Sequence, residues 1–126
     1  MPDDYEYVGF HHVFDVKMYV TRKARLVAEG HKTPDPVTST YAGVVSRESV
    51  RIALTYAALN DLDIKSADIS NAYLQAPTSE KYYTKLVPEF GRYNGQLAYV
   101  VRAAYGLKSA GADFRNHLRD CMKHLM

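Results

Sequence analysis

The sequence predicts an α+β fold in which antiparallel hairpins are combined with two main helices. Residues 10–29 show an imperfect alternation of apolar and polar side chains that is typical of a hairpin, and residues 82–87 and 97–103 are also strand-like. Residues 47–60 and the segment from 109 onward instead repeat apolar side chains at the three- and four-residue spacing of amphipathic helices. Because hairpins and helices are segregated along the chain, this pattern favours α+β over a doubly wound α/β sheet.

The first half of the chain is expected to form a hairpin, a loop and a helix. Residues 10–29 form the hairpin, and Pro34 and Pro36 indicate a loop over residues 31–41. The helix is expected over residues 47–60, with Ser46 as its N-cap, Glu48 in its first turn and Asn60-Asp61 at its end. Its apolar positions recur at helical spacing: Val50, Ala53, Leu54, Ala57 and Ala58.

In the second half we expect three strands and a final helix. Residues 62–69 alternate as a strand that crosses the core, and residues 82–87 and 97–103 form two more strands around a loop at 88–95. The helix begins near Ser109. Its apolar stripe consists of Phe114, Leu118, Cys121, Met122 and Leu125.

Composition limits the class of protein. A chain of 126 residues has the length of one domain, and a single cysteine, Cys121, excludes a disulfide framework and a CxxC-type zinc site. No window reaches the 18 or so apolar residues of a membrane helix, and the acidic N-terminus is unlike a signal peptide, so we expect an intracellular protein without membrane contact. The net charge of +2 is too small to establish nucleic-acid binding, although residues 10–32 and 101–126 are mildly basic.

Asp68 is the residue that most invites a chemical role. Alone, an acid at the end of a predicted strand is usually exposed or capping. Here it opens the run Asp68-Ile69-Ser70-Asn71-Ala72-Tyr73. The strand ends in Asp, two small polar residues stand two and three positions after it, and an aromatic residue stands five positions after it. This pattern resembles the first metal-binding segment of palm-type polymerases.

Three further blocks, in the same order, make the resemblance specific. The run from Arg22 to Gly30 resembles the fingers hairpin of copia-type retrotransposon reverse transcriptases. Residues 44–51 with the alanine-rich helix after them resemble that family's next block, and Tyr105-Gly106-Leu107-Lys108-Ser109 resembles its Tyr-Gly-Leu-Lys segment. The similarity extends from about Phe14 to Leu118. It implies a partial right-hand polymerase, residues 1–126 forming one domain that is fingers-like over about 10–60 and palm-like over about 61–126.

The resemblance also implies roles for individual residues. Asp68 would be a catalytic Mg²⁺ ligand, and Lys23 and Arg25 would hold the triphosphate of a dNTP. Ser70, Asn71 and Ala72 would offer backbone N–H groups to the same phosphates, and Tyr73 would be the steric gate against a ribose 2′-hydroxyl. Around the template and the nascent base pair, the contacts would come from Tyr105, Gly106 and Lys108. The implied partners are an RNA or DNA template, a DNA primer and the remainder of the polymerase, in a cytoplasmic particle or the nucleus.

The residues alone leave simpler readings open. Tyr73 is one of eleven tyrosines, Lys23 and Arg25 could be the solvated face of a hairpin, and Gly106 could be a turn glycine. The three histidines of the first half lack acidic or cysteine partners at metal-ligand spacing: His11, His12 and His31. The pair Tyr82-Tyr83 could stack on bases but is more often strand packing.

The sequence lacks the second acidic motif that this chemistry needs. The family supplies it as a Tyr-x-Asp-Asp hairpin downstream of Tyr-Gly-Leu-Lys, and nothing of that kind follows Lys108; the Asp-Asp pair of this chain is Asp3-Asp4. One carboxylate cannot hold two metals, so the chain alone is expected to be inactive and to bind Mg²⁺ weakly. The alternatives are a non-catalytic nucleic-acid-binding remnant of a degenerate element, and a small α+β domain with no retained role.

Overall fold

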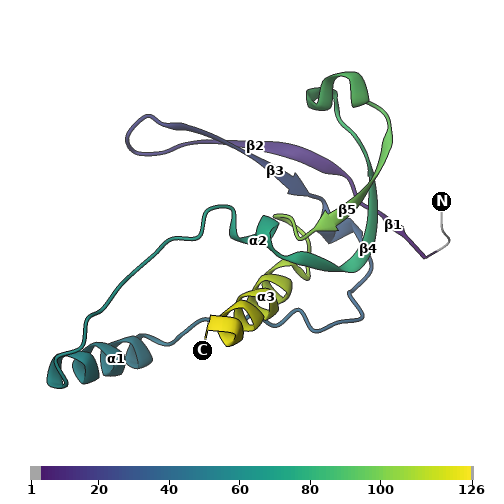
Figure 1. Cartoon of the computed structure of the whole chain (residues 1–126). Helices are drawn as coiled ribbons and strands as arrows, with labels where there is room; N and C mark the ends of the chain where they lie inside the picture. Colours follow the sequence, from purple (N-terminus) through teal and green to yellow (C-terminus); the bar gives the residue numbers. More distant parts are fainter. Residues whose placement is uncertain (1–3, 126) are drawn as a thin grey trace.

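The computed structural model describes residues 4–125 and has the predicted α+β architecture (Figure 1). One sheet has the order β1-β4-β5, and a separate two-stranded sheet is the hairpin β2–β3. The strands are β1 (Glu6–Tyr7), β2 (Phe10–Val16), β3 (Arg22–Ala28), β4 (Pro77–Lys85) and β5 (Leu97–Arg102). The helices are α1 (Arg47–Leu59), α2 (Ala72–Gln75) and α3 (Ala110–Leu125), with two 3₁₀ turns, η1 (Gly30–Lys32) and η2 (Pro88–Tyr93).

The hairpins and the two long helices confirm the predictions for those segments. β2 and β3 pair antiparallel in unbroken register from Phe10 opposite Ala28 to Val16 opposite Arg22. α1 begins after Ser46, whose side chain accepts a hydrogen bond from the Ser49 N–H as an N-cap does, and Asn60 caps its end. None of the helices within residues 4–125 is long and apolar enough to cross a membrane.

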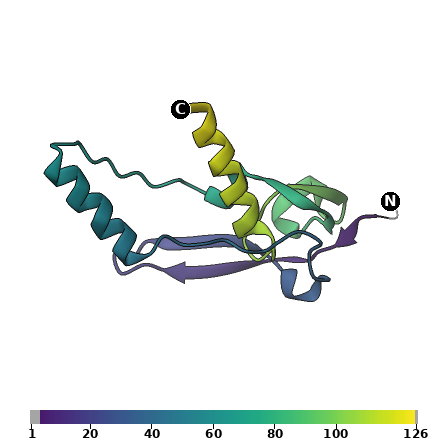
Figure 2. The same ribbon diagram turned by 90° about the horizontal axis from the view of Figure 1, so that it is seen from below.

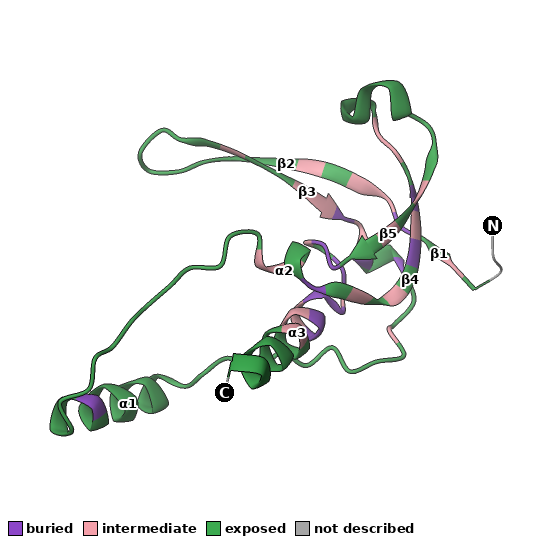
Figure 3. Cartoon of the chain, in the orientation of Figure 1, coloured by how far each residue is buried: buried purple, intermediate pink, exposed green. Residues whose placement is uncertain are grey.

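The predicted strand at residues 62–69 is wrong. The whole stretch 61–70 is exposed, and no described strand pairs with it; it runs as an open segment from α1 to α2 (Figures 1 and 3). Apolar alternation favours an extended backbone, but a strand also needs a neighbour for its hydrogen bonds. The predicted loop at 88–95 is also partly wrong, because residues 88–93 coil into η2 around a kink at Gly91.

The core is small and lies where the ends of several elements meet (Figure 3). Its buried members are mostly alanines: Val8, Ala28, Ala76, Tyr82, Ala103, Ala104, Leu107 and Ala110. Small side chains let the backbones of these elements approach closely. β1 adds a short parallel pairing to β4, with Glu6 opposite Tyr82, that the sequence did not predict. Of the Asp3-Asp4 pair, Asp3 lies outside the described residues, and Asp4 pairs with Lys81 of β4.

α1 stands apart from this core. Exposed segments lead into and out of it, and within the described structure only Ala57 of the helix is buried (Figures 1, 2 and 3). The outer half of α3 is similarly uncovered, since Met122 and Leu125 of its apolar stripe are exposed. In α3 the first turns, which include Ala110 and Ala112, therefore supply its buried contacts.

A backbone crossing ties the hairpin to the rest of the fold, and we call it the glycine junction (Ala28 and Gly30 against Tyr105 and Gly106). The Ala28 N–H donates to the Tyr105 carbonyl at 2.6 Å. A Cβ atom on Gly106, which has φ +93°, would lie 2.0 Å from the Ala28 carbonyl oxygen, and one on Gly30 would lie 2.2 Å from the Gly106 carbonyl oxygen. Both positions therefore require glycine.

Lys108 fastens the loop that follows the hairpin to the same turn. Its ammonium donates to the Thr33 carbonyl at 2.8 Å and to Asp35 Oδ1 at 2.9 Å. The hydrogen bond from Lys108 lowers the pKa of the Asp35 carboxyl below its ordinary value. Thr33 is buried, whereas the Asp35 side chain is almost fully exposed.

We expect Gly106→Ala to destabilise the chain far more than Gly91→Ala. Both glycines have positive φ, but a Cβ on Gly91 would meet nothing within 4 Å. The positive φ strains an alanine at both sites, and at Gly106 the clash adds about 1–3 kcal/mol. Urea unfolding measures both free energies. Equal losses would show that the close approach of Gly106 to Ala28 does not exist in solution.

Removing Lys108 should cost more stability than removing the charge of Asp35. Lys108→Met takes the donor from a buried carbonyl, at a cost of about 1 kcal/mol, whereas Asp35→Asn leaves the bond to Thr33 in place. Because the Asp35 pKa is lowered in the folded state, the stability that this ion pair contributes is present above the carboxyl's ordinary pKa and is lost as the pH falls through the lowered one. Unfolding midpoints of both variants between pH 7 and strongly acidic pH test this; a larger effect of Asp35→Asn would contradict it.

Candidate functional site

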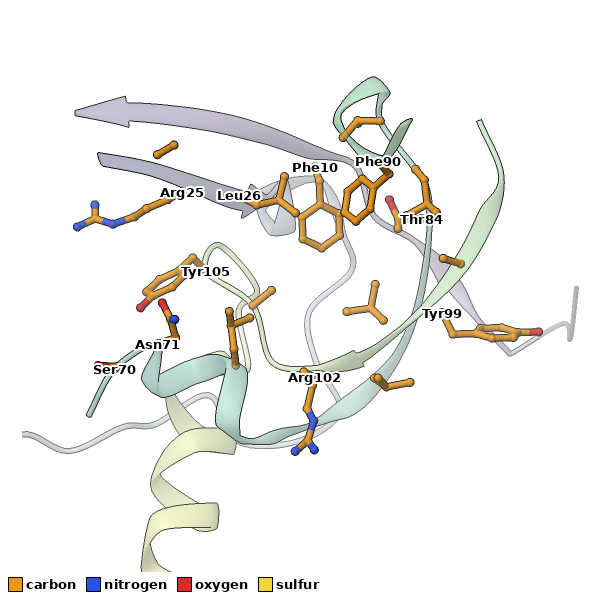
Figure 4. Close-up of a pocket in the computed structure, with 18 of the residues that line it drawn as sticks. Phe10, Arg25, Leu26, Ser70, Asn71, Thr84, Phe90, Tyr99, Arg102 and Tyr105 are labelled. Atoms are coloured by element: carbon orange, nitrogen blue, oxygen red, sulfur yellow. The ribbon is translucent and has the colours of Figure 1, made fainter. Parts of the chain in front are cut away.

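A cleft of about 810 Å³ lies between the hairpin and the three-stranded sheet (Figure 4). One wall is the first part of β3, residues 23–26, and another is the segment 68–71 that leads into α2. The end of β4 and most of β5 contribute to the rest, together with Tyr105 of the glycine junction. Because the junction fixes how the hairpin meets the sheet, it also sets the width of this cleft.

The cleft brings together six of the residues singled out in the sequence, although they come from three distant segments. These six are Lys23, Arg25, Asp68, Ser70, Asn71 and Tyr105. Four others do not line it: Ala72, Tyr73, Gly106 and Lys108. The segments that carry the motifs thus meet in space, while the individual roles assigned to these residues stay predictions.

The turn at Ser70-Asn71 determines how the 68–71 wall is presented. Asn71 adopts a left-handed backbone, φ 51°, a conformation that asparagine tolerates better than most residues, and α2 begins directly after it. The Leu74 N–H donates to the Asn71 carbonyl at 2.9 Å, and the Gln75 side chain donates to the Ser70 carbonyl at 3.4 Å. These bonds hold Ser70 and Asn71 on the cleft side of α2, as Figure 4 shows.

Tyr73 lies behind the cleft wall. Its half-buried ring packs against Tyr105, with ring centroids 5.0 Å apart, and against Phe114 of α3 at 6.3 Å. Tyr105 in turn lines the cleft (Figure 4). In this arrangement Tyr73 supports the ring that faces the cleft instead of facing it directly.

Gly106 and Lys108 make their described contacts within the chain. Gly106 approaches the Ala28 backbone, and the Lys108 ammonium is held by Thr33 and Asp35. The turn that carries both residues is thereby fixed to the base of the hairpin. That structural role is independent of any ligand.

Cations outnumber the one carboxylate among the residues lining the cleft. The lining residues include four cations, Lys23, Arg25, Lys85 and Arg102, and the carboxylate of Asp68. Arg102 donates to the Gln75 carbonyl at 2.8 Å, which links β5 to the end of α2. A basic cleft of this kind favours an anionic ligand.

Sequence reasoning missed Lys85, Arg102 and an apolar end of the cleft formed by Phe10, Leu26 and Phe90 (Figure 4). Lys85 is the last residue of β4 and Arg102 is the last residue of β5. Their positions at the ends of predicted strands could have identified them. No sequence signal predicted that Phe10 would lie near Phe90, because residues 88–95 were expected to form an irregular loop.

The residues of this chain do not fit a two-metal site. Asp68 is the one carboxylate lining the cleft, and residues 4–125 contain no group of three or more His, Cys, Asp or Glu side chains placed to hold a metal ion. Two divalent ions that clamp a transferring phosphoryl group need several carboxylates between them. Among the histidines, His11 approaches Glu29 at 3.9 Å and His12 approaches Glu89 at 3.3 Å, so each faces an acid but neither joins a cluster.

Comparisons with known proteins agree with the motif order. All residues, 1–126, match the family described as Reverse transcriptase (RNA-dependent DNA polymerase). The chain is 35% identical over 104 residues to the truncated transposon Ty1-A Gag-Pol polyprotein of Saccharomyces cerevisiae, a match that covers 81% of this chain and 9% of that protein. The Ty1-LR3 and Ty1-PR1 Gag-Pol polyproteins of the same yeast match equally, at 6% of their length.

These relatives are much longer proteins, since the chain spans less than a tenth of each. No solved structure matches the chain significantly. The family match covers the whole chain, including the hairpin, the 68–71 segment and the glycine junction that together form the cleft. The chain therefore belongs to the reverse transcriptase family and is homologous to a segment of Ty1 Gag-Pol polyproteins.

Proposed function

We propose that this chain forms the fingers, about residues 10–60, and the first half of the palm, about 61–126, of a copia-type RNA-directed DNA polymerase. The observation that carries the proposal is the cleft, in which β3, the segment 68–71 and Tyr105 meet. Each of these three contains one of the motifs by which the sequence resembles the family. Chance convergence of three motifs on one basic cleft is a poorer explanation.

In this proposal the cleft receives the triphosphate of a dNTP. Arg25 is the principal contact because its guanidinium fork can bond two phosphate oxygens, and Lys23 adds a point charge. Backbone N–H groups at Ser70, Asn71 and Ala72 complete the phosphate contacts. Tyr73 acts on the sugar through the ring of Tyr105, against which it packs.

Asp68 is the one metal ligand that this chain contributes to the cleft. Mg²⁺ suits its hard carboxylate oxygen, and in the family the metal neutralises charge on the phosphates. The remaining carboxylates have to come from another polypeptide segment, so the chain alone should not extend a primer. Its partners are a template, a DNA primer and the polypeptide that completes the palm, within the intracellular particle or nucleus where such elements replicate.

A second candidate function is non-catalytic binding of nucleic acid by the hairpin. The observation that favours it is the charge of residues 15–25, which contain four cations and one acid. None of the four cations has an ion-pair partner within residues 4–125. Phosphate contacts by these side chains would weaken steeply with salt. Salt-insensitive binding would remove this candidate.

Arg25→Gln should weaken dNTP binding about tenfold or more, because a charge-assisted hydrogen bond contributes about 1.5–3 kcal/mol. Isothermal titration with dTTP in metal-free buffer measures the affinity. Arg51→Gln, on the exposed and distant α1, is the charge-matched control and should leave it unchanged. Asp68→Asn should strengthen metal-free binding, since it removes a negative charge from the cleft. Equal affinities for the Arg25 and Arg51 variants would contradict the proposal.

A further inference from the structure

We infer that the apolar end of the cleft, formed by Phe10, Leu26 and Phe90, is a binding site for a small uncharged aromatic molecule that carries one hydroxyl group. The group that recognises such a molecule is the buried hydroxyl of Thr84, which also lines the cleft. A phenol is the simplest member of this ligand class. The site is independent of the proposed function, because it uses neither the cations of the cleft nor Asp68.

Thr84 places a polar atom on a face of the sheet that is otherwise apolar. It lies near the end of β4 opposite Ala98 of β5, and Tyr82 stands opposite Val100 on the same face. Thr84 is 7% exposed, and its Oγ1 is buried without a hydrogen-bond partner within residues 4–125. A valine would fill the same space without an unsatisfied polar atom. The residue therefore holds a hydrogen-bonding group that the fold itself leaves unused.

Apolar side chains surround this hydroxyl on the cleft side of the sheet. In Figure 4 the Thr84 hydroxyl points toward the side of the cleft where the rings of Phe10 and Phe90 lie. Leu26 and Val100 line the same cleft, so the apolar lining comes from β2, β3, η2 and β5. Sites for small organic molecules combine apolar walls with a few polar groups that fix the orientation of the ligand. This end of the cleft has that composition.

Phe90 is the member of this wall that can give way to a ligand. Phe10 and Val100 pack against the buried core, which holds them in place. Phe90 is instead 43% exposed and is carried by η2, which has a kink at Gly91. If the Phe90 ring turns toward solvent, the Thr84 hydroxyl is uncovered while the core stays packed. A ligand ring can then contact both the apolar wall and the hydroxyl.

The chemistry of this end selects an uncharged ligand with one polar group. An ion would lose its hydration among apolar side chains without gaining a paired charge, whereas a ring gains from the burial of its apolar surface. The Thr84 hydroxyl can donate one hydrogen bond and accept others, and the hydroxyl of a phenol can do the same. A methyl group in that position would leave the Thr84 atom unsatisfied. Thr84 should therefore raise the affinity for a phenol relative to that for a toluene of similar size.

The test uses 4-fluorophenol and 4-fluorotoluene, each titrated with the whole chain and followed by ¹⁹F NMR. We expect 4-fluorophenol to bind with a dissociation constant on the order of 1 mM, as suits a ligand of so few atoms. Thr84→Val should lower the ratio of the phenol affinity to the toluene affinity about tenfold, because the bound phenol loses its polar partner. Thr84→Ser keeps a hydroxyl and should keep the ratio. An unchanged ratio in Thr84→Val would overturn the inference.

Thr78→Val is the matched control, since Thr78 is on the same strand but does not line the cleft. It should leave both affinities unchanged. Urea unfolding adds a readout that needs no ligand: Thr84→Val should raise the midpoint, because it removes an unsatisfied buried group. Thr78→Val should lower the midpoint, because the Thr78 Oγ1 accepts from the Glu80 N–H at 3.3 Å. A lowered midpoint for Thr84→Val would show that its hydroxyl already has a partner, and would overturn the inference.

Contacts of the bound probe locate the site on the unmodified chain, so the test does not depend on the folding of any variant. Intermolecular NOEs from 4-fluorophenol should reach the rings of Phe10 and Phe90 and the methyl groups of Leu26. NOEs confined to α1 or to the outer half of α3, which also expose apolar side chains, would overturn the inference.

The outcomes also separate this site from the proposed function. Arg25→Gln should leave the 4-fluorophenol affinity unchanged, because the probe carries no charge. Binding of 4-fluorophenol without any binding of dTTP would overturn the proposed function alone, and the reverse result would overturn this inference alone. Thymidine bound at Phe10 and Phe90, with neither fluorinated probe bound, would identify the apolar end as part of a nucleoside site and would also overturn the inference.

Discussion

The contact of two backbones at the glycine junction is the constraint on which the rest of this structure depends. Ala28 and Gly30 meet Tyr105 and Gly106 so closely that neither glycine has room for a Cβ atom. This contact joins the base of the hairpin to the turn before α3, and the alanine-rich core around it keeps the neighbouring elements equally close. The cleft exists because the junction holds the hairpin over the sheet at one fixed distance.

The charges of the cleft follow the same geometry. Its cations come from β3, β4 and β5, while Asp68 comes from a segment without a pairing partner in the described structure. An anionic ligand is therefore met mainly by side chains on strands. The lone carboxylate stands on the least constrained wall, which agrees with the proposal that another segment completes the metal chemistry.

The sequence predicted the features that depend on local pattern and missed those that depend on distant partners. The hairpin over residues 10–29 and α1 with its Ser46 cap follow from alternation, helical spacing and capping chemistry within a few residues. The 62–69 segment has the alternation of a strand but no neighbour to pair with, and β1 has almost no pattern yet pairs with β4. Likewise the motifs indicated Lys23, Arg25, Asp68 and Tyr105, whereas Lys85 and the packing of Tyr73 behind Tyr105 arise only when the hairpins meet.

The most direct test of the account is a map of the backbone amides that respond to a nucleotide. In a titration of the ¹⁵N-labelled chain with dTTP, the shifted amide resonances should belong to residues 23–26, 68–71 and 105, with those of α1 unchanged. That result would show that three distant segments form one site under the control of the glycine junction. Shifts confined to a single segment, or centred on α1 or the end of α3, would contradict it.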